Sequence, residues 1–159
     1  MFQCMVGRNG NEAEIRFPCE ESDIRRVQRD LQIPYPSDTR VTVLGMDSDI
    51  EHLSVLEGQQ ADLDFLNLLG RMMYGLDERE YKQFQIGLYH ESVMDLKGIM
   101  NVLADVHRYS IIDLNDMEKS GLEHEFDVRG GIPTDEIKNT DYSPVAQKLI
   151  DSGKCKNTP

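Results

Sequence analysis

The sequence predicts an α+β protein in which a small three-stranded sheet with one helix precedes a compact helical unit. Residues 12–17 (EAEIRF) alternate between apolar and polar side chains, as in a strand with one buried face. Ile24, Val27 and Leu31 recur at helical spacing, and the same spacing reappears from about residue 60. Strand signals therefore occupy the first part of the chain, and helix signals dominate the middle.

The first predicted element is a β-hairpin. Residues 1–6 (MFQCMV) can form the strand that precedes the alternating one, and Asn9-Gly10 between them favours the two positive φ angles of a tight turn. Pro18 ends the second strand. A third strand is expected at residues 40–46 (RVTVLGM), which completes a ββαβ unit.

The segment between the second and third strands predicts a helix at residues 22–31. Ser22 is a favourable N-cap, and the acids on either side of it favour the positive end of the helix dipole. These acids also crowd Cys19. Because they are explained by helix chemistry and no histidine lies nearby in sequence to act as a base, we interpret Cys19 as a structural thiol.

Three helices are expected between about residues 60 and 107. Asp77 and Glu80 have the pattern of a capping box at the start of the second helix, and Ser92 is the expected cap of the third. Phe65 and Met72 flank the apolar stripe of the first helix. The residues expected to face a core are Leu66, Leu69, Met73, Tyr81, Phe84, Leu88, Leu96, Ile99, Leu103 and Val106.

An acidic, irregular segment before residue 60 indicates a domain boundary near Gly58. The predicted parts are an N-terminal ββαβ domain at 1–58, a helical domain at 59–108 and a partly irregular C-terminal segment at 109–159. In the last part, the run YSII allows a strand and VAQKLIDSG indicates a short helix. The final GKCKNTP is typical of a frayed tail.

The composition argues against several classes of function. No apolar run approaches the roughly 18 residues of a membrane span, and no basic leader precedes a long apolar stretch, so we expect a cytoplasmic protein that does not bind membranes. The three cysteines form no C-x-x-C pair and the four histidines lie apart, so neither a metal nor another cofactor is expected. Because nucleophile and phosphate-loop motifs are missing, we also predict that the chain is not an enzyme.

The net charge of −12 is concentrated in one part of the chain. Residues 41–128 hold eighteen acids and six bases, whereas residues 1–40 carry −1 and residues 129–159 carry +1. Such a surface repels phosphates, so binding to nucleic acid is not expected. The charge either keeps the protein in solution or meets a basic partner.

The run IRFPCEESDIRRVQRDLQI, followed by LDFLNLLGRMMYGLDEREYKQF and SVMDLKGIMNVLADVHRYSI, resembles the ArdA antirestriction proteins of conjugative plasmids and transposons. The resemblance covers roughly residues 1–112. It implies an elongated, acidic protein of small domains that imitates bent B-DNA and occupies the DNA groove of type I restriction-modification enzymes. After about residue 112, where the family places its dimer contact, the sequence diverges from the family pattern.

The resemblance implies a site made of many surface carboxylates. Acids one turn apart on a helix are about 5–6 Å apart, whereas each DNA strand carries one negative charge for about every 3.4 Å of helix axis, so several helices must act together. The expected partner is a basic DNA-binding protein, bound in a strongly salt-dependent way, and a homodimer is an open alternative to a monomer. The expected partner-binding residues are Asp47, Asp49, Glu51, Glu57, Asp62, Asp64, Asp77, Glu78, Glu80, Glu91, Asp95, Asp105, Asp113, Asp116 and Glu118.

Two other functions stay open on the sequence alone. The first is a non-inhibitory interaction module of a mobile genetic element, which keeps the N-terminal fold but has another partner. The second, ranked last, is an enzyme that uses a carboxylate pair or Cys19. A continuous negative surface would favour DNA mimicry, and a cleft with a titrating pair or a reactive thiol would favour the enzyme.

Overall fold

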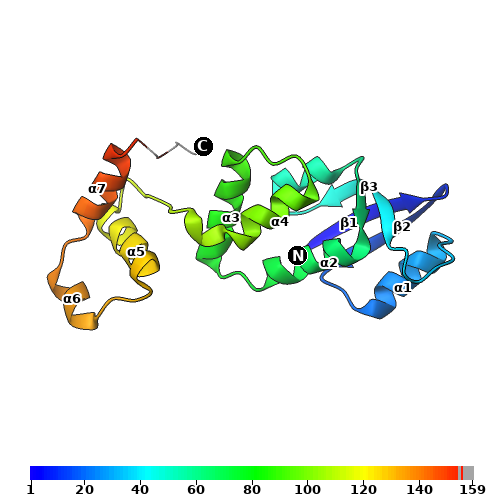
Figure 1. Cartoon of the computed structure of the whole chain (residues 1–159), viewed down its shortest axis with the longest axis horizontal. Coiled ribbons are helices and arrows are strands. Elements are labelled where there is room, and N and C mark those ends of the chain that lie inside the picture. The colour runs from blue at the N-terminus through cyan, green and yellow to red at the C-terminus, as the bar shows by residue number, and fades with distance from the viewer. Residues whose placement is uncertain (154, 156–159) are drawn as a thin grey trace. The chain divides into compact units, whose positions relative to one another are not determined.

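The structure is a computed structural model that describes residues 1–153 and 155 (Figure 1). The chain divides into two compact units, Met1–Val106 and His107–Pro159, which we call unit 1 and unit 2. The elements, in chain order, are β1 (Phe2–Arg8), β2 (Asn11–Phe17), α1 (Glu21–Asp30), β3 (Arg40–Asp47), η1 (Glu51–Leu56), β4 (Gln60–Asp62), α2 (Leu63–Tyr74), α3 (Glu78–His90), α4 (Leu96–Ala104), η2 (Val106–Arg108), α5 (Met117–Arg129), α6 (Thr134–Asn139) and α7 (Ser143–Asp151).

Unit 1 is α+β and contains an antiparallel sheet with the strand order β2-β1-β3-β4. The predicted hairpin is confirmed, since β1 and β2 pair across Asn9 and Gly10, whose φ angles are 54° and 76°. Along β2, Ala13, Ile15 and Phe17 are buried, and the residues between them are exposed. This alternation directs one face of the sheet into the core.

The sheet has four strands, so the prediction of three was wrong. β4 spans only Gln60–Asp62 and pairs with β3, with Ala61 opposite Val41. Three residues are too few to show a recognisable alternation, and the segment before them, predicted to be irregular, contains the 3-10 helix η1. Because β4 leads directly into α2, the expected boundary near Gly58 lies inside unit 1. The expected boundary at residue 108 is close to the end of the unit at Val106.

Two helix starts differ from the prediction. The N-cap of α1 is Glu20 and not Ser22, and the Asp23 carboxylate accepts a hydrogen bond from the Glu20 backbone N–H at 3.3 Å. The N-cap of α4 is Asp95, whose carboxylate accepts from a backbone N–H at 2.7 Å. Ser92 has a φ of 49°, which lies in the left-handed region and not in the extended region of a helix cap.

The predicted capping box of α3 is confirmed. The Asp77 carboxylate accepts from the Glu80 backbone N–H at 2.8 Å, and the Glu80 carboxylate accepts from the Asp77 backbone N–H at 3.0 Å. Tyr81 and Leu96, predicted to face the core, are only half-buried. The other predicted core positions of the helical segment are buried, namely Leu66, Leu69, Met73, Phe84, Leu88, Ile99, Leu103 and Val106.

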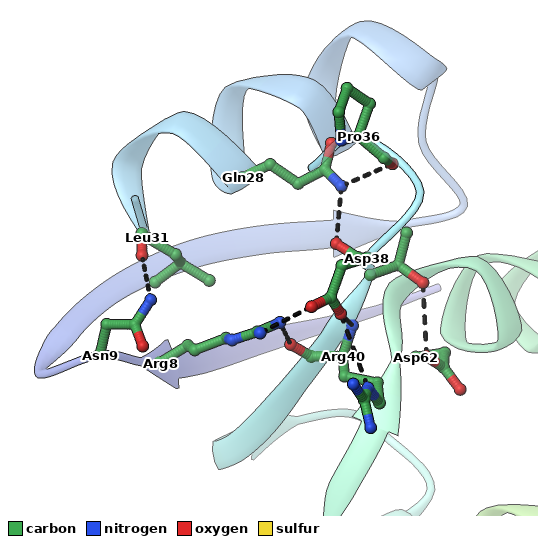
Figure 2. A network of polar contacts seen from close by, with 9 residues as sticks. Arg8, Asn9, Gln28, Leu31, Pro36, Asp38, Arg40 and Asp62 are labelled. Atoms are coloured by element: carbon green, nitrogen blue, oxygen red, sulfur yellow. Dashed lines mark hydrogen bonds and ion pairs between the residues drawn. The ribbon is translucent and has the colours of Figure 1, made fainter. Parts of the chain in front are cut away.

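A polar network holds the loop between α1 and β3 (Figure 2). The Arg8 guanidinium forms an ion pair with Asp38 at 2.7 Å and donates a hydrogen bond to the Arg40 carbonyl at 2.9 Å. The buried Gln28 amide donates to the carbonyls of Pro36 and Asp38 at 3.0 and 2.9 Å. The network therefore joins the end of β1 to α1 and to the start of β3.

The described residues of unit 2 form helices and no strand, so a strand at YSII is wrong. The short helix expected near the C-terminus is confirmed as α7. α5 packs so closely on the start of α7 that a Cβ on Gly121 would lie 1.9 Å from the Tyr142 carbonyl oxygen. In the predicted frayed tail, residues 154 and 156–159 lie outside the described part of the chain.

Candidate functional site

The fifteen carboxylates predicted to bind a partner all have access to solvent within their own unit. Twelve lie in unit 1, and Asp113, Asp116 and Glu118 lie in unit 2. None of the fifteen, which all belong to the described part of the chain, is buried. Asp105 and two others are half-exposed, and the remaining twelve are exposed.

In unit 1 the carboxylates follow one another over successive elements. Residues 41–106 hold twelve acids and four bases, a net charge of −8. The carboxylates occur at the end of β3 (Asp47), in the following loop and η1 (Asp49, Glu51), after η1 (Glu57), in β4 (Asp62), in the first turn of α2 (Asp64), at the start of α3 (Asp77, Glu78, Glu80), after α3 (Glu91), at the N-cap of α4 (Asp95) and after α4 (Asp105).

Several of these carboxylates also stabilise the fold, beyond the caps of α3 and α4. Glu57 accepts a hydrogen bond from the Met46 backbone N–H at 2.9 Å, and Asp62 accepts from the Thr39 hydroxyl at 3.4 Å (Figure 2). In unit 2, the Asp116 carboxylate caps α5 by accepting a hydrogen bond from the Lys119 backbone N–H at 3.1 Å. Because an amide oxygen can accept the same bonds, replacing these acids by Asn or Gln separates their charge from their structural role.

Cys19 has the environment of a structural thiol. Its backbone N–H donates to the Asn67 side-chain oxygen at 2.8 Å, and the Asn67 amide donates back to the Cys19 carbonyl at 3.1 Å. Burial, together with the negative charge of Asp23, raises the pKa of the thiol to about 11. Burial also raises the pKa of Cys4, to about 12. Both groups are therefore neutral at pH 7, whereas a nucleophilic cysteine needs a lowered pKa.

A hollow of about 400 Å³ lies on unit 1, lined by Met1, Phe2, Gln3, Arg16, Asp47, Ser48 and Asp49. It is open to solvent, and the Arg16 guanidinium is bound to the Gln3 side-chain oxygen at 3.1 Å. Ser48 contributes a hydroxyl group to this lining, but no histidine lines the hollow to act as a base for a serine nucleophile. Among the described residues, no cluster of three or more His, Cys, Asp and Glu side chains is arranged to hold a metal ion.

The structure adds an apolar surface that the sequence analysis did not name. Phe65 and Met72, expected to flank the inward stripe of α2, lie with Leu68 on its outer face. Phe65 is 52% exposed and Leu68 is 43% exposed. The signal was present in the sequence, because residues 65, 68 and 72 form a second apolar stripe at helical spacing.

No protein-family model, curated protein or solved structure matches the chain. The resemblance in residues 1–112 therefore stays a prediction. Of the helices in the described ranges 1–153 and 155, none has both the length and the apolar character that crossing a membrane requires.

Proposed function

We propose that the chain is a DNA-mimic antirestriction protein that binds the DNA groove of type I restriction-modification enzymes. The observation that carries this proposal is the exposure of the carboxylates. All twelve carboxylates in residues 41–106 reach solvent, and this part of unit 1 has a net charge of −8. The sequence resemblance supplies the class of partner. A groove that holds duplex DNA must present lysine and arginine side chains, and these can form ion pairs with carboxylates in place of phosphates.

The carboxylate array differs from DNA in its charge density. Each strand of DNA carries one phosphate for about every 3.4 Å of helix axis, and DNA has a layer of condensed counterions that it releases on binding. The carboxylates of unit 1 are spread over loops, a strand end and helix starts, so they condense fewer counterions. Binding should therefore weaken with salt, with a shallower slope of log K against log salt than the same enzyme shows for duplex DNA.

Competition with DNA tests the proposal. The full chain should displace a labelled duplex from a purified type I methyltransferase core, measured by fluorescence anisotropy between about 50 and 200 mM salt. Each exposed ion pair is worth about 0–1 kcal/mol, so single neutral variants should change the affinity by less than about fivefold. A combined variant carries the substitutions Asp47→Asn, Glu51→Gln, Asp64→Asn and Glu91→Gln. It should bind about tenfold or more weakly at low salt, and its slope of log K against log salt should be shallower than that of the wild type.

The matched control removes four exposed acids from the first forty residues, with the substitutions Glu12→Gln, Glu14→Gln, Glu21→Gln and Asp30→Asn. It should change the affinity and the salt slope much less than the test variant. Equal losses for the two variants would mean that only total charge matters. Binding that ignores salt, or that fails to displace the duplex, would contradict DNA mimicry and favour an interaction module with another partner.

A further inference from the structure

The helix α2 has an apolar outer face that the packing of unit 1 does not use. Phe65, Leu68 and Met72 follow the spacing i, i+3 and i+7, which places them on one side of the helix. Phe65 and Leu68 are exposed and Met72 is half-exposed, whereas the opposite side of α2 is buried. A helix on a protein surface usually presents polar side chains outward, so this face needs an explanation.

Carboxylates lie at the start of α2 and shortly after its end. Asp62 is the N-cap of α2 and Asp64 lies in its first turn, while Asp77 follows shortly after its last residue. Glu78, the next acid, already forms an ion pair with Lys82 at 2.8 Å. Arg71 is the single base in the sequence of the helix. A surface of this kind is complementary to lysine and arginine, because these side chains combine a long aliphatic stem with a cationic end. An aromatic ring such as that of Phe65 also attracts a cation directly.

We propose that Phe65, Leu68 and Met72 form an apolar anchor that packs against the aliphatic stems of lysine and arginine side chains on the basic DNA-binding partner. This inference rests on the proposed function and adds a contact that DNA itself does not make. Ionic strength screens the attraction between exposed charges but leaves the burial of apolar surface almost unchanged. The anchor should therefore supply the part of the affinity that salt does not remove.

The test uses the full chain with Phe65→Gln and Leu68→Gln together, because glutamine keeps a high helix propensity. The matched control is Phe126→Gln with Ile137→Gln, which removes two apolar side chains of unit 2 that are 48% and 37% exposed. The Kd for the type I methyltransferase core is measured by competition with duplex DNA between about 50 and 200 mM salt. The anchor variant should bind about tenfold more weakly at every salt concentration with an unchanged salt slope, and the control should bind like the wild type.

Five outcomes would overturn the anchor. If the wild type does not displace the duplex, the proposed function fails and the anchor fails with it. If the wild type binds in a salt-dependent way and the anchor variant binds equally well, the anchor alone is wrong. A change in salt slope as large as that of the acid-neutralised variant would mean that the substitutions act through the carboxylates. A lower melting temperature of the free variant would mean that the apolar face is already covered within the chain. Sedimentation of the variant as a smaller species than the wild type would mean that a second copy of the chain covers it.

Discussion

Replacing Gly70 by alanine tests the contact that places α2 on the sheet. A Cβ at this position would lie 2.8 Å from the Phe17 Cβ and 2.9 Å from the Pro18 backbone nitrogen, which is closer than van der Waals contact. Phe17 is fully buried and the Pro18 nitrogen belongs to the backbone, so neither neighbour has a simple way to move aside. Alanine must therefore displace α2 or the end of β2.

The expected cost follows from two opposing effects. Overpacking a core typically costs about 1–3 kcal/mol, and the clash with a backbone atom favours the upper part of that range. Alanine recovers about 1 kcal/mol relative to glycine through its higher helix propensity. We therefore expect a net loss of about 1–2 kcal/mol in the free energy of unfolding. For a unit of this size, that loss corresponds to a fall in melting temperature of about 4–16 °C.

Thermal unfolding of the full chain, followed by circular dichroism, measures the effect. The matched control is Gly75→Ala at the end of the same helix, where the nearest atom would be 3.5 Å from the new Cβ and φ is −80°. This control should melt within a few degrees of the wild type. If Gly70→Ala melts at or above the wild-type temperature, α2 does not approach β2 as closely as the structure indicates, and the reasoning is refuted.

Two further predictions concern single carboxylates. Asp77→Ala should lower the free energy of unfolding by about 1 kcal/mol, because it removes the acceptor of the Glu80 backbone N–H. Asp77→Asn keeps an acceptor and should lower the free energy of unfolding by only a few tenths of a kcal/mol. Urea unfolding measures both variants, and equal losses would mean that the charge of Asp77 and not its cap is responsible. The hydrogen bond from Arg8 holds the pKa of Asp38 well below its ordinary value of 3.8, so this carboxylate stabilises the fold above that pH and progressively less below it. Asp38→Asn should therefore melt below the wild type at pH 7, with a difference that shrinks between about pH 4 and pH 2, and a difference independent of pH would contradict the linkage.

The elements that could be predicted from sequence are those with a complete local signal. Asn9-Gly10 specifies its turn without help from distant residues, and the capping box of Asp77 and Glu80 closes within one helical turn. β4 has no such signal, because its three residues become a strand only by pairing with β3. α5 was missed for a similar reason, since its apolar residues are sparse and it packs on α7 through Gly121.

The candidate carboxylates could be named from sequence because acidic side chains are rarely buried without a partner. The capping roles of Asp77 and Glu80 could also be named, but the structural roles of Glu57 and Asp62 could not. Glu57 and Asp62 accept hydrogen bonds from residues that are 11 and 23 positions away, and these partners become neighbours only in the folded sheet. Alanine substitutions at these two positions would therefore combine a loss of charge with a loss of stability.

The outer face of α2 shows how far sequence pattern alone can go. The helix has two apolar stripes at helical spacing, and periodicity does not say which one is buried. Gly70 decides between them, because a residue without a Cβ lets α2 approach β2 on the side of Leu66 and Met73 and leaves Phe65 and Leu68 outside. The close packing and the exposed anchor are then two results of one helix placement. Gly70→Ala should accordingly lower both stability and affinity for a basic partner, whereas Phe65→Gln with Leu68→Gln should lower the affinity alone.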